Sequence, residues 1–320
     1  MATGDSQQGP IRLSALIPDF QDRLVRVMEL ADAQVAEATE LDITKDSAIQ
    51  RTLPVVHPAA LMENNLARKG IWQSEPNREQ IEFTYTTEDV IGSLTIEYSL
   101  GQLSTADMEL VSWILGRWRP GNPKIGFALR DYGRACKVAW GGNKSERLKQ
   151  ALHRISRTRF TGRVWEQKSR RHTTRHFGIF DDVIIHERKN SFDGPVVNEE
   201  GTVTITLSTF VLEQLEGQQF VRLNWGILRT GLRNRLSRRL YVFLESQRGF
   251  SGGTLYEITI DNALIETLGS SDKKNLPRFR AKLQKAGEEI VGADPRYEEV
   301  RIRAAAGSNG YVLHVRRKAA

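Results

Sequence analysis

Arginine, lysine and glutamine side chains recur at helical spacing near the C-terminal end of this 320-residue chain. Arg278, Lys282 and Lys285 are four and three residues apart, so on a helix they would share one face. Arg and Lys can donate hydrogen bonds to guanine in a DNA major groove, and Gln can pair with adenine. A solvated helix face is the alternative interpretation. The residues assigned to this cluster are Lys273, Lys274, Arg278, Arg280, Lys282, Gln284 and Lys285.

A second cluster of the same chemistry lies in the middle of the chain. Its members are Lys144, Arg147, Gln150, Arg154 and Arg157, opposite an apolar row formed by Leu148, Leu152 and Ile155. Two separate helices, each apolar on one face and basic on another, favour binding of double-stranded DNA over two unrelated solvated faces.

A third group of cations is predicted at the tip of one β-hairpin and at the end of a second. Basic residues at a hairpin tip can contact phosphates or enter a minor groove, and a solvated turn or a basic tail is the alternative. The first tip carries Lys168, Arg170, Arg171 and Arg175, and the second hairpin ends in Arg316 and Arg317.

Net charge is distributed unevenly along the sequence. Residues 1–100 hold 8 Lys and Arg against 16 Asp and Glu, a net charge of −8, whereas residues 101–320 hold 38 against 23, a net charge of +15. A basic surface of this size suits a polyanionic partner, because neutralised phosphates supply most of the non-specific affinity for nucleic acid.

Motifs for catalysis or cofactor binding are missing from the sequence, so we expect neither an enzyme nor a cofactor. There is no Gly-x-x-x-x-Gly-Lys-Ser/Thr phosphate loop and no His-x-His pair. His172 and His176 have a spacing found in zinc sites, but they fall in an expected turn. Asp181 and Asp182 are adjacent on an expected strand and would face opposite sides. Cys136 is expected to pack in the core.

The central basic cluster requires a helix, a turn, a second helix and a hairpin in that order. The pattern predicts a short helix over Ala59–Lys69, strands over Ile81–Tyr85 and Leu94–Leu100, a helix capped by Ser104 and ending near Trp118, a strand over Ile125–Leu129, helices over Asp131–Ala139 and Asn143–Arg157, and strands over Phe160–Gln167 and Arg175–His186 joined by Lys168–Thr174. Asn143 and Glu146 have the spacing of a capping box.

The same order recurs after a polar stretch at 187–201. It predicts a strand over Val203–Leu207, a helix capped by Ser208, helices over Trp225–Thr230 and Arg233–Gln247, a strand over Leu255–Ile260, helices over Asn262–Leu268 and Leu276–Val291, and strands over Tyr297–Arg303 and Tyr311–Arg317. The apolar stripe of the last helix is expected to be Leu276, Phe279, Leu283 and Ile290. The fold class is therefore predicted as α+β, with two tandem winged-helix domains.

The domain plan places these two units after an N-terminal extension. Residues 1–53 are predicted as a flexible arm with an acidic amphipathic helix over Asp19–Glu40, 54–200 as the first winged-helix domain, and 201–320 as the second. The acidic helix either packs on its own protein, mediates dimerisation or binds a host factor. The lack of a signal sequence, the lack of a long apolar run and the single cysteine favour a cytoplasmic protein.

Several segments also carry a family likeness, which spans about residues 54–318. They are His57–Gly70, Leu103–Leu110, Gly141–Lys144, Leu148–Ile155, Arg222–Trp225, Arg233–Phe243, Leu276–Leu283 and Val312–Arg317. In residues and spacing these segments resemble the TrfA-type plasmid replication initiators, a family of iteron-binding Rep proteins.

The resemblance implies binding to direct repeats (iterons) at a plasmid origin, opening of adjacent A·T-rich DNA, and recruitment of the host proteins DnaA and DnaB helicase. A monomer–dimer equilibrium is a separate expectation. Some family members bind the sliding clamp through a Gln-Leu-Ser/Asp-Leu-Phe motif, and here Gln102–Leu103–Ser104 continues without the hydrophobic pair. Two alternatives stay open: a winged-helix transcriptional repressor that binds operator DNA as a dimer, and a DNA nuclease or relaxase.

Overall fold

The fold is described from a computed structural model, for residues 59–76, 83–89, 92–166, 171–186, 201–247, 255–305 and 310–318. The acidic helix predicted over Asp19–Glu40 lies outside these residues, as does most of the polar stretch at 187–201. No helix of the described residues is long and apolar enough to cross a bilayer.

The first helix-turn-helix consists of α3 (Thr105–Leu115), α4 (Leu129–Ala135) and α5 (Gly142–Arg157), with β4 (Lys124–Ala128) between α3 and α4. The predicted cap of α3 is confirmed: the Ser104 and Asp107 side chains each accept a hydrogen bond from the other residue's backbone N–H. The predicted capping box at Asn143 is wrong. Helix α5 begins at Gly142 and its N-cap is the extended residue Gly141, so Asn143 lies inside the first turn.

Strands β5 (Arg159–Glu166) and β6 (Arg171–Phe177) form the hairpin that follows α5 and pair antiparallel from Phe160–Phe177 to Glu166–Arg171. They belong to a four-stranded sheet with β2 (Phe83–Asp89) and β3 (Gly92–Tyr98), in the order β2-β3-β5-β6. The hairpin is confirmed, but the predicted long turn over Lys168–Thr174 is wrong in part, since Arg171–Thr174 belong to β6.

The strand predicted over Arg175–His186 is two strands in the structure. Chain direction changes after Phe177, and β7 (Phe180–His186) joins β8 (Thr202–Leu207) and β4 in a separate sheet of order β4-β8-β7. A bulge between Phe180 and Asp182 breaks the side-chain alternation, so Asp181 and Asp182 are both exposed rather than on opposite sides. The partner strand β8 is remote in sequence, which is why local alternation did not reveal the break.

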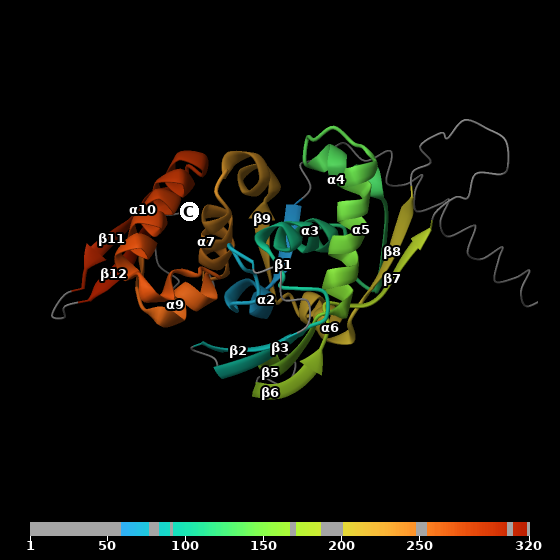
Figure 1. The fold of residues 1–320 in the computed structure, drawn as a ribbon, viewed down its shortest axis with the longest axis horizontal. Coiled ribbons are helices and arrows are strands. Elements are labelled where there is room, and N and C mark those ends of the chain that lie inside the picture. The colour runs from blue at the N-terminus through green and yellow to red at the C-terminus, as the bar shows by residue number, and fades with distance from the viewer. Residues whose placement is uncertain are drawn as a thin grey trace, which may run out of the picture. The chain divides into compact units, whose positions relative to one another are not determined.

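The second winged helix follows the predicted order closely. It contains α7 (Arg235–Ser246), β10 (Leu255–Thr259), α9 (Asn262–Thr267), the short 3-10 turn η3 (Asp272–Lys274), α10 (Leu276–Ala293), β11 (Tyr297–Ala304) and β12 (Tyr311–Arg317). The strands pair in the order β10-β12-β11, with α10 packed against β11 (Figure 1). Phe279, Leu283 and Ile290 are buried as predicted. Leu276 is 40% exposed, because it sits at the first helical position and projects beyond the packed face.

Residues that precede the first winged helix connect it to the second. The predicted helix over Ala59–Lys69 is instead β1 (Ala59–Glu63) followed by α2 (Asn64–Arg68). β1 pairs antiparallel with β9 (Phe220–Asn224), a contact between segments about 160 residues apart that local periodicity could not reveal. β9 follows α6 (Thr209–Glu216), whose predicted Ser208 cap is confirmed, and leads into a π-helical turn, η2 (Ile227–Gly231).

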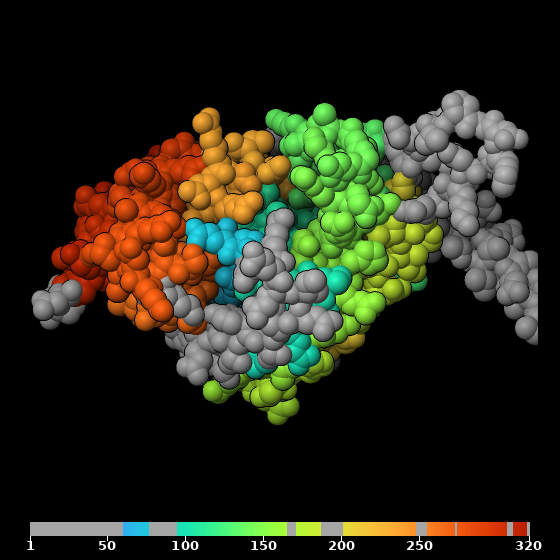
Figure 2. All heavy atoms as spheres, in the orientation of Figure 1, coloured from blue at the N-terminus to red at the C-terminus, as the bar shows by residue number. Residues whose placement is uncertain are grey.

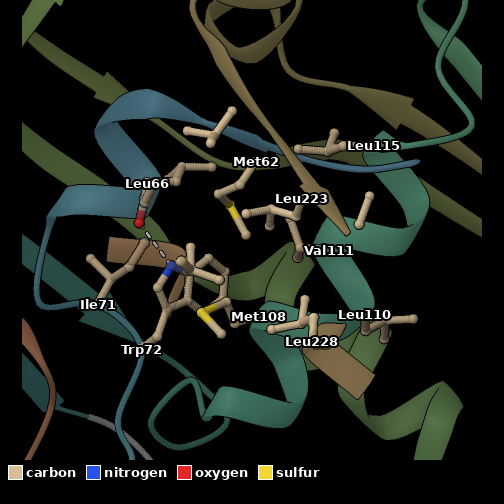
Figure 3. Close-up of a cluster of buried hydrophobic side chains, with 14 of the residues drawn as sticks. Met62, Leu66, Ile71, Trp72, Met108, Leu110, Val111, Leu115, Leu223 and Leu228 are labelled. Atoms are coloured by element: carbon tan, nitrogen blue, oxygen red, sulfur yellow. Dashed lines mark hydrogen bonds between the residues drawn. The ribbon is translucent and has the colours of Figure 1, made fainter. Parts of the chain in front are cut away.

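The core at this junction is apolar and continuous (Figure 3). Met62, Leu66, Ile71 and Trp72 meet Met108, Leu110, Val111 and Leu115 of α3, together with Leu223 of β9 and Leu228 of η2. The indole N–H of Trp72 donates to the Leu66 carbonyl at 2.8 Å, so the one polar atom of that side chain is satisfied.

The described residues therefore form an α+β fold that contains two winged-helix units, as predicted (Figure 1). The sequence predicts a domain boundary near residue 200. Strand β8 comes after this position in the sequence, but it pairs with β4 and β7, which come before it. These arrangements leave α5 and α10 as the last helix of each helix-turn-helix, the position of a recognition helix.

Candidate nucleic-acid interface

Helix α5 has one buried and one exposed side. Leu148, Leu152 and Ile155 are buried, as predicted. Arg147, Gln150 and Arg157 are exposed, and their side chains make no hydrogen bond or ion pair with the described residues. Lys144 is exposed too, with its ammonium group 2.5 Å from the Ala139 carbonyl in the preceding turn.

Arg154 belongs to the fold rather than to this exposed row. Its Nη2 and Nε donate to the two carboxylate oxygens of Asp107, at 2.7 and 3.3 Å. Asp107 is 1% exposed and also caps α3. Arg154 thus fixes the position of α5 on α3, and its guanidinium is already occupied.

Sequence reasoning missed three further residues on the outer face of α5: Asn143, Glu146 and His153 are exposed. Asn143 and Glu146 precede Gln150 by seven and four residues, and His153 follows it by three. These intervals place all four residues on one face of the helix. Their helical spacing from Gln150 is the sequence signal for these residues, but they are not cations, and a pattern of cations and Gln does not include them.

The basic wing is described only in part. Lys168 and Arg170 lie outside the described residues. Arg171 and Arg175 are four residues apart on β6, a spacing that places them on the same side of the strand. Arg171 is exposed. Arg175 forms an ion pair with Glu213 at 3.1 Å, with its guanidinium carbon 5.7 Å from the centre of the Phe210 ring.

In helix α10, two of the predicted DNA-contacting cations form ion pairs with carboxylates of the protein. Lys282 Nζ lies 2.7 Å from both Glu75 Oε1 and Asp272 Oδ2, and Arg278 Nε lies 3.4 Å from Asp272 Oδ1. The hydrogen bond from Lys282 holds the pKa of Glu75 below its ordinary value. Asp272 is 6% exposed and needs a cation. Lys282 therefore connects α10 to the segment that contains Glu75.

Two more residues of this group support the neighbouring hairpin. Arg280 stacks on the Tyr311 ring, with its guanidinium carbon 3.8 Å from the ring centre. The Gln284 side-chain oxygen accepts from the Ile302 backbone N–H at 3.1 Å, and its amide donates to Glu288. Gln284 therefore holds β11 against the helix.

Lys274 and Lys285 are exposed, and neither side chain pairs within the described part of the chain. Lys273 lies in η3, and its side chain is outside the described set. The spheres of α5 (green) and of α9 and α10 (orange) both reach the face seen in Figure 2.

The cations at the end of β12 differ from each other. Arg316 is 57% exposed and pairs with Glu298 at 2.9 Å. Arg317 is 15% exposed and donates a hydrogen bond to the Glu245 carboxylate at 2.5 Å. Its guanidinium carbon lies 4.1 Å from the centre of the Tyr297 ring. Arg317 is thereby part of the packing between α7 and β11.

The structure also shows where the candidate metal ligands and the cysteine lie. The described residues contain no group of three or more His, Cys, Asp or Glu side chains able to hold a metal ion. His172 and His176 lie on β6 rather than in a turn, because the hairpin turn comes earlier in the chain. Cys136 is buried as predicted, and burial raises the pKa of its thiol.

The described fold and site define a tandem winged-helix protein with one largely unoccupied basic helix face and a second that is partly neutralised by its own carboxylates. No family model matches the sequence. No curated protein matches it either.

Solved structures are similar in fold. The crystal structure of domains 2 and 3 of RctB aligns with a TM-score of 0.51 at 13% identity, covering 79% of this chain and 98% of that one. A second structure of RctB domains 2–3 aligns with a TM-score of 0.47 at 10% identity, covering 80% and 97%. The first alignment shows that the two-domain fold is shared.

Proposed function

We propose that this protein binds double-stranded DNA specifically and initiates replication at a plasmid origin. The observation that carries DNA binding is the exposed row on α5, in which Arg147, Gln150 and Arg157 have no partner among the described residues. Long donors held on a rigid helix, at the recognition position of a winged helix, suit the major groove.

Two observations support the step from DNA binding to replication. Segments over about 54–318 resemble the TrfA-type initiators, and the fold is shared with nearly the full length of domains 2 and 3 of RctB, itself a replication initiator. In this proposal each winged helix contacts one part of a direct repeat, and DnaA and DnaB act after the DNA has been opened.

The proposed work of the protein is binding and deformation of DNA. The sequence has no phosphate loop, so binding energy would drive bending or untwisting, and A·T-rich and pyrimidine–purine steps deform at the lowest cost. Affinity should fall steeply with salt, because each neutralised phosphate releases bound counterions.

Sliding-clamp binding is not part of the proposal. Leu103 is buried and Ser104 caps α3, so the Gln102–Leu103–Ser104 segment is occupied by the fold. A clamp-binding peptide would need these side chains at the surface.

The test is nuclease protection on the DNA that surrounds the protein's own gene. Protection of a set of direct repeats supports an initiator. Protection of inverted half-sites in a promoter supports the repressor alternative, because a symmetric dimer reads a palindrome. Cleavage of supercoiled DNA with a divalent metal would support the nuclease alternative.

A further inference from the structure

The exposed face of α5 contains an acid. Asn143, Glu146, Gln150, His153 and Arg157 are exposed along the helix, at intervals of three or four residues. These intervals define one stripe, and Glu146 lies one turn before Gln150 in that stripe. Arg154 does not belong to it, since its guanidinium is bound to Asp107.

Among the described residues, the carboxylate of Glu146 has only one weak ion pair. Its side chain is 60% exposed, and the nearest cation, Lys149 Nζ, is 3.9 Å away. An exposed ion pair of this kind contributes little to stability. Glu146 is also next to Arg147, so it weakens the positive potential where phosphates would approach.

We propose that Glu146 is a specificity-determining residue that accepts a hydrogen bond from the N4 amino group of a cytosine. This inference rests on the proposed DNA binding through α5. Glu146 is in the N-terminal half of the helix, the part of a recognition helix that contacts base edges.

The donor pattern of the major groove selects cytosine. Its edge there presents an amino donor, which a carboxylate can pair with. Guanine presents two acceptors, thymine an acceptor and a methyl group, and adenine an acceptor beside its amino group, so each of these places a lone pair or an apolar group near the carboxylate. Glu146 therefore favours one base and disfavours the others.

A purely structural role makes a different prediction. Negative charge near the start of a helix is favourable, and the Glu146–Lys149 pair could stabilise α5 slightly. If that is the whole role, Glu146→Gln lowers the unfolding midpoint and leaves base preference unchanged.

The experiment is a selection from randomised duplex DNA with the full-length wild-type protein, Glu146→Gln and Asp181→Asn. Asp181 is an exposed carboxylate on β7 with no side-chain partner among the described residues, so its variant controls for the change in net charge. We expect one C·G position to be preferred about tenfold by the wild type and by Asp181→Asn. Glu146→Gln should lose this preference, because its amide both donates and accepts hydrogen bonds and can also pair with adenine.

Two results overturn the inference: an unchanged sequence preference with Glu146→Gln, or an equal loss of preference with Asp181→Asn. A wild-type protein that enriches no sequence at all contradicts the proposed function itself. The two failures are therefore distinguishable.

Discussion

Arg154 of α5 donates to both carboxylate oxygens of Asp107, the buried residue that caps α3. The side chain at the centre of a predicted DNA-contacting row is thus used to hold the recognition helix on the first helix of its domain. Its neighbour Arg157, three residues on, is exposed and unpaired within the described residues.

This difference predicts opposite phenotypes for two arginines. Arg154→Ala leaves Asp107 buried without its cation and should lower the free energy of unfolding by about 1.5–3 kcal/mol. Arg157→Ala should change stability by less than about 0.5 kcal/mol and weaken DNA binding by about 1–3 kcal/mol. Urea unfolding and DNA titration measure the two effects. Equal stability of the two variants would contradict the assignment.

Helix α10 offers a second matched pair. Lys282→Ala removes the ion pair with Glu75 and the shorter of the two ion pairs of Asp272, and it should cost about 1–3 kcal/mol of stability. Lys285→Ala should leave stability within about 0.5 kcal/mol and reduce the salt dependence of DNA binding, as loss of one phosphate contact does. A stable Lys282→Ala variant with weakened DNA binding would instead make Lys282 a DNA contact.

The buried carboxyl group of Glu63 should make the free energy of unfolding of this protein depend on pH. Its carboxylate caps α2 and is fully buried, and burial raises its pKa from 4.5 to about 7. Between pH 4.5 and 7, the folded state therefore keeps a proton on Glu63 that the unfolded state has lost. The contribution of Glu63 to the free energy of unfolding is complete below pH 4.5 and is lost as the pH rises through 7. The loss should approach about 3 kcal/mol.

The measurement is urea unfolding of the wild type and of Glu63→Gln at about pH 5 and pH 8. The variant cannot ionise at this position, so the wild type should lose more stability than the variant between the two values. The same change in both proteins would show that Glu63 does not carry the dependence.

Alanine substitutions at Gly269 and Gly121 test how tightly the segment around Trp72 packs on the second helix-turn-helix. Both glycines have positive φ, +63° and +79°. A Cβ on Gly269 would lie 2.3 Å from the Trp72 carbonyl oxygen, whereas one on Gly121 would meet nothing within 4 Å. Gly121→Ala should cost about 1 kcal/mol of stability and Gly269→Ala about 3 kcal/mol or more. Similar thermal unfolding shifts would contradict the packing.

The sequence was sufficient for elements with strong local signals. Periodic apolar residues located α5, α7 and α10, and the Ser104 and Ser208 caps gave the starts of two helices. It was insufficient where a remote partner decides the structure. β1 forms because β9 pairs with it, and β7 separates from β6 because β8 pairs with β7.

The candidate site divides in the same way. The exposed position of Arg147, Gln150 and Arg157 follows from helical periodicity alone. That Arg154 meets Asp107, and that Lys282 meets Glu75 and Asp272, depends on tertiary contacts between residues 10 to more than 200 positions apart. Charge and spacing identified cations but could not tell which ones have carboxylate partners.

The most direct test of the central claim is a nuclease footprint of the wild type and an Arg147→Ala, Arg157→Ala double variant on the DNA around the protein's own gene. We predict protected direct repeats with the wild type, and loss of protection with the double variant although it remains folded. An absence of protected repeats with the wild type, or unchanged protection with the double variant, would contradict the proposal that α5 recognises an origin.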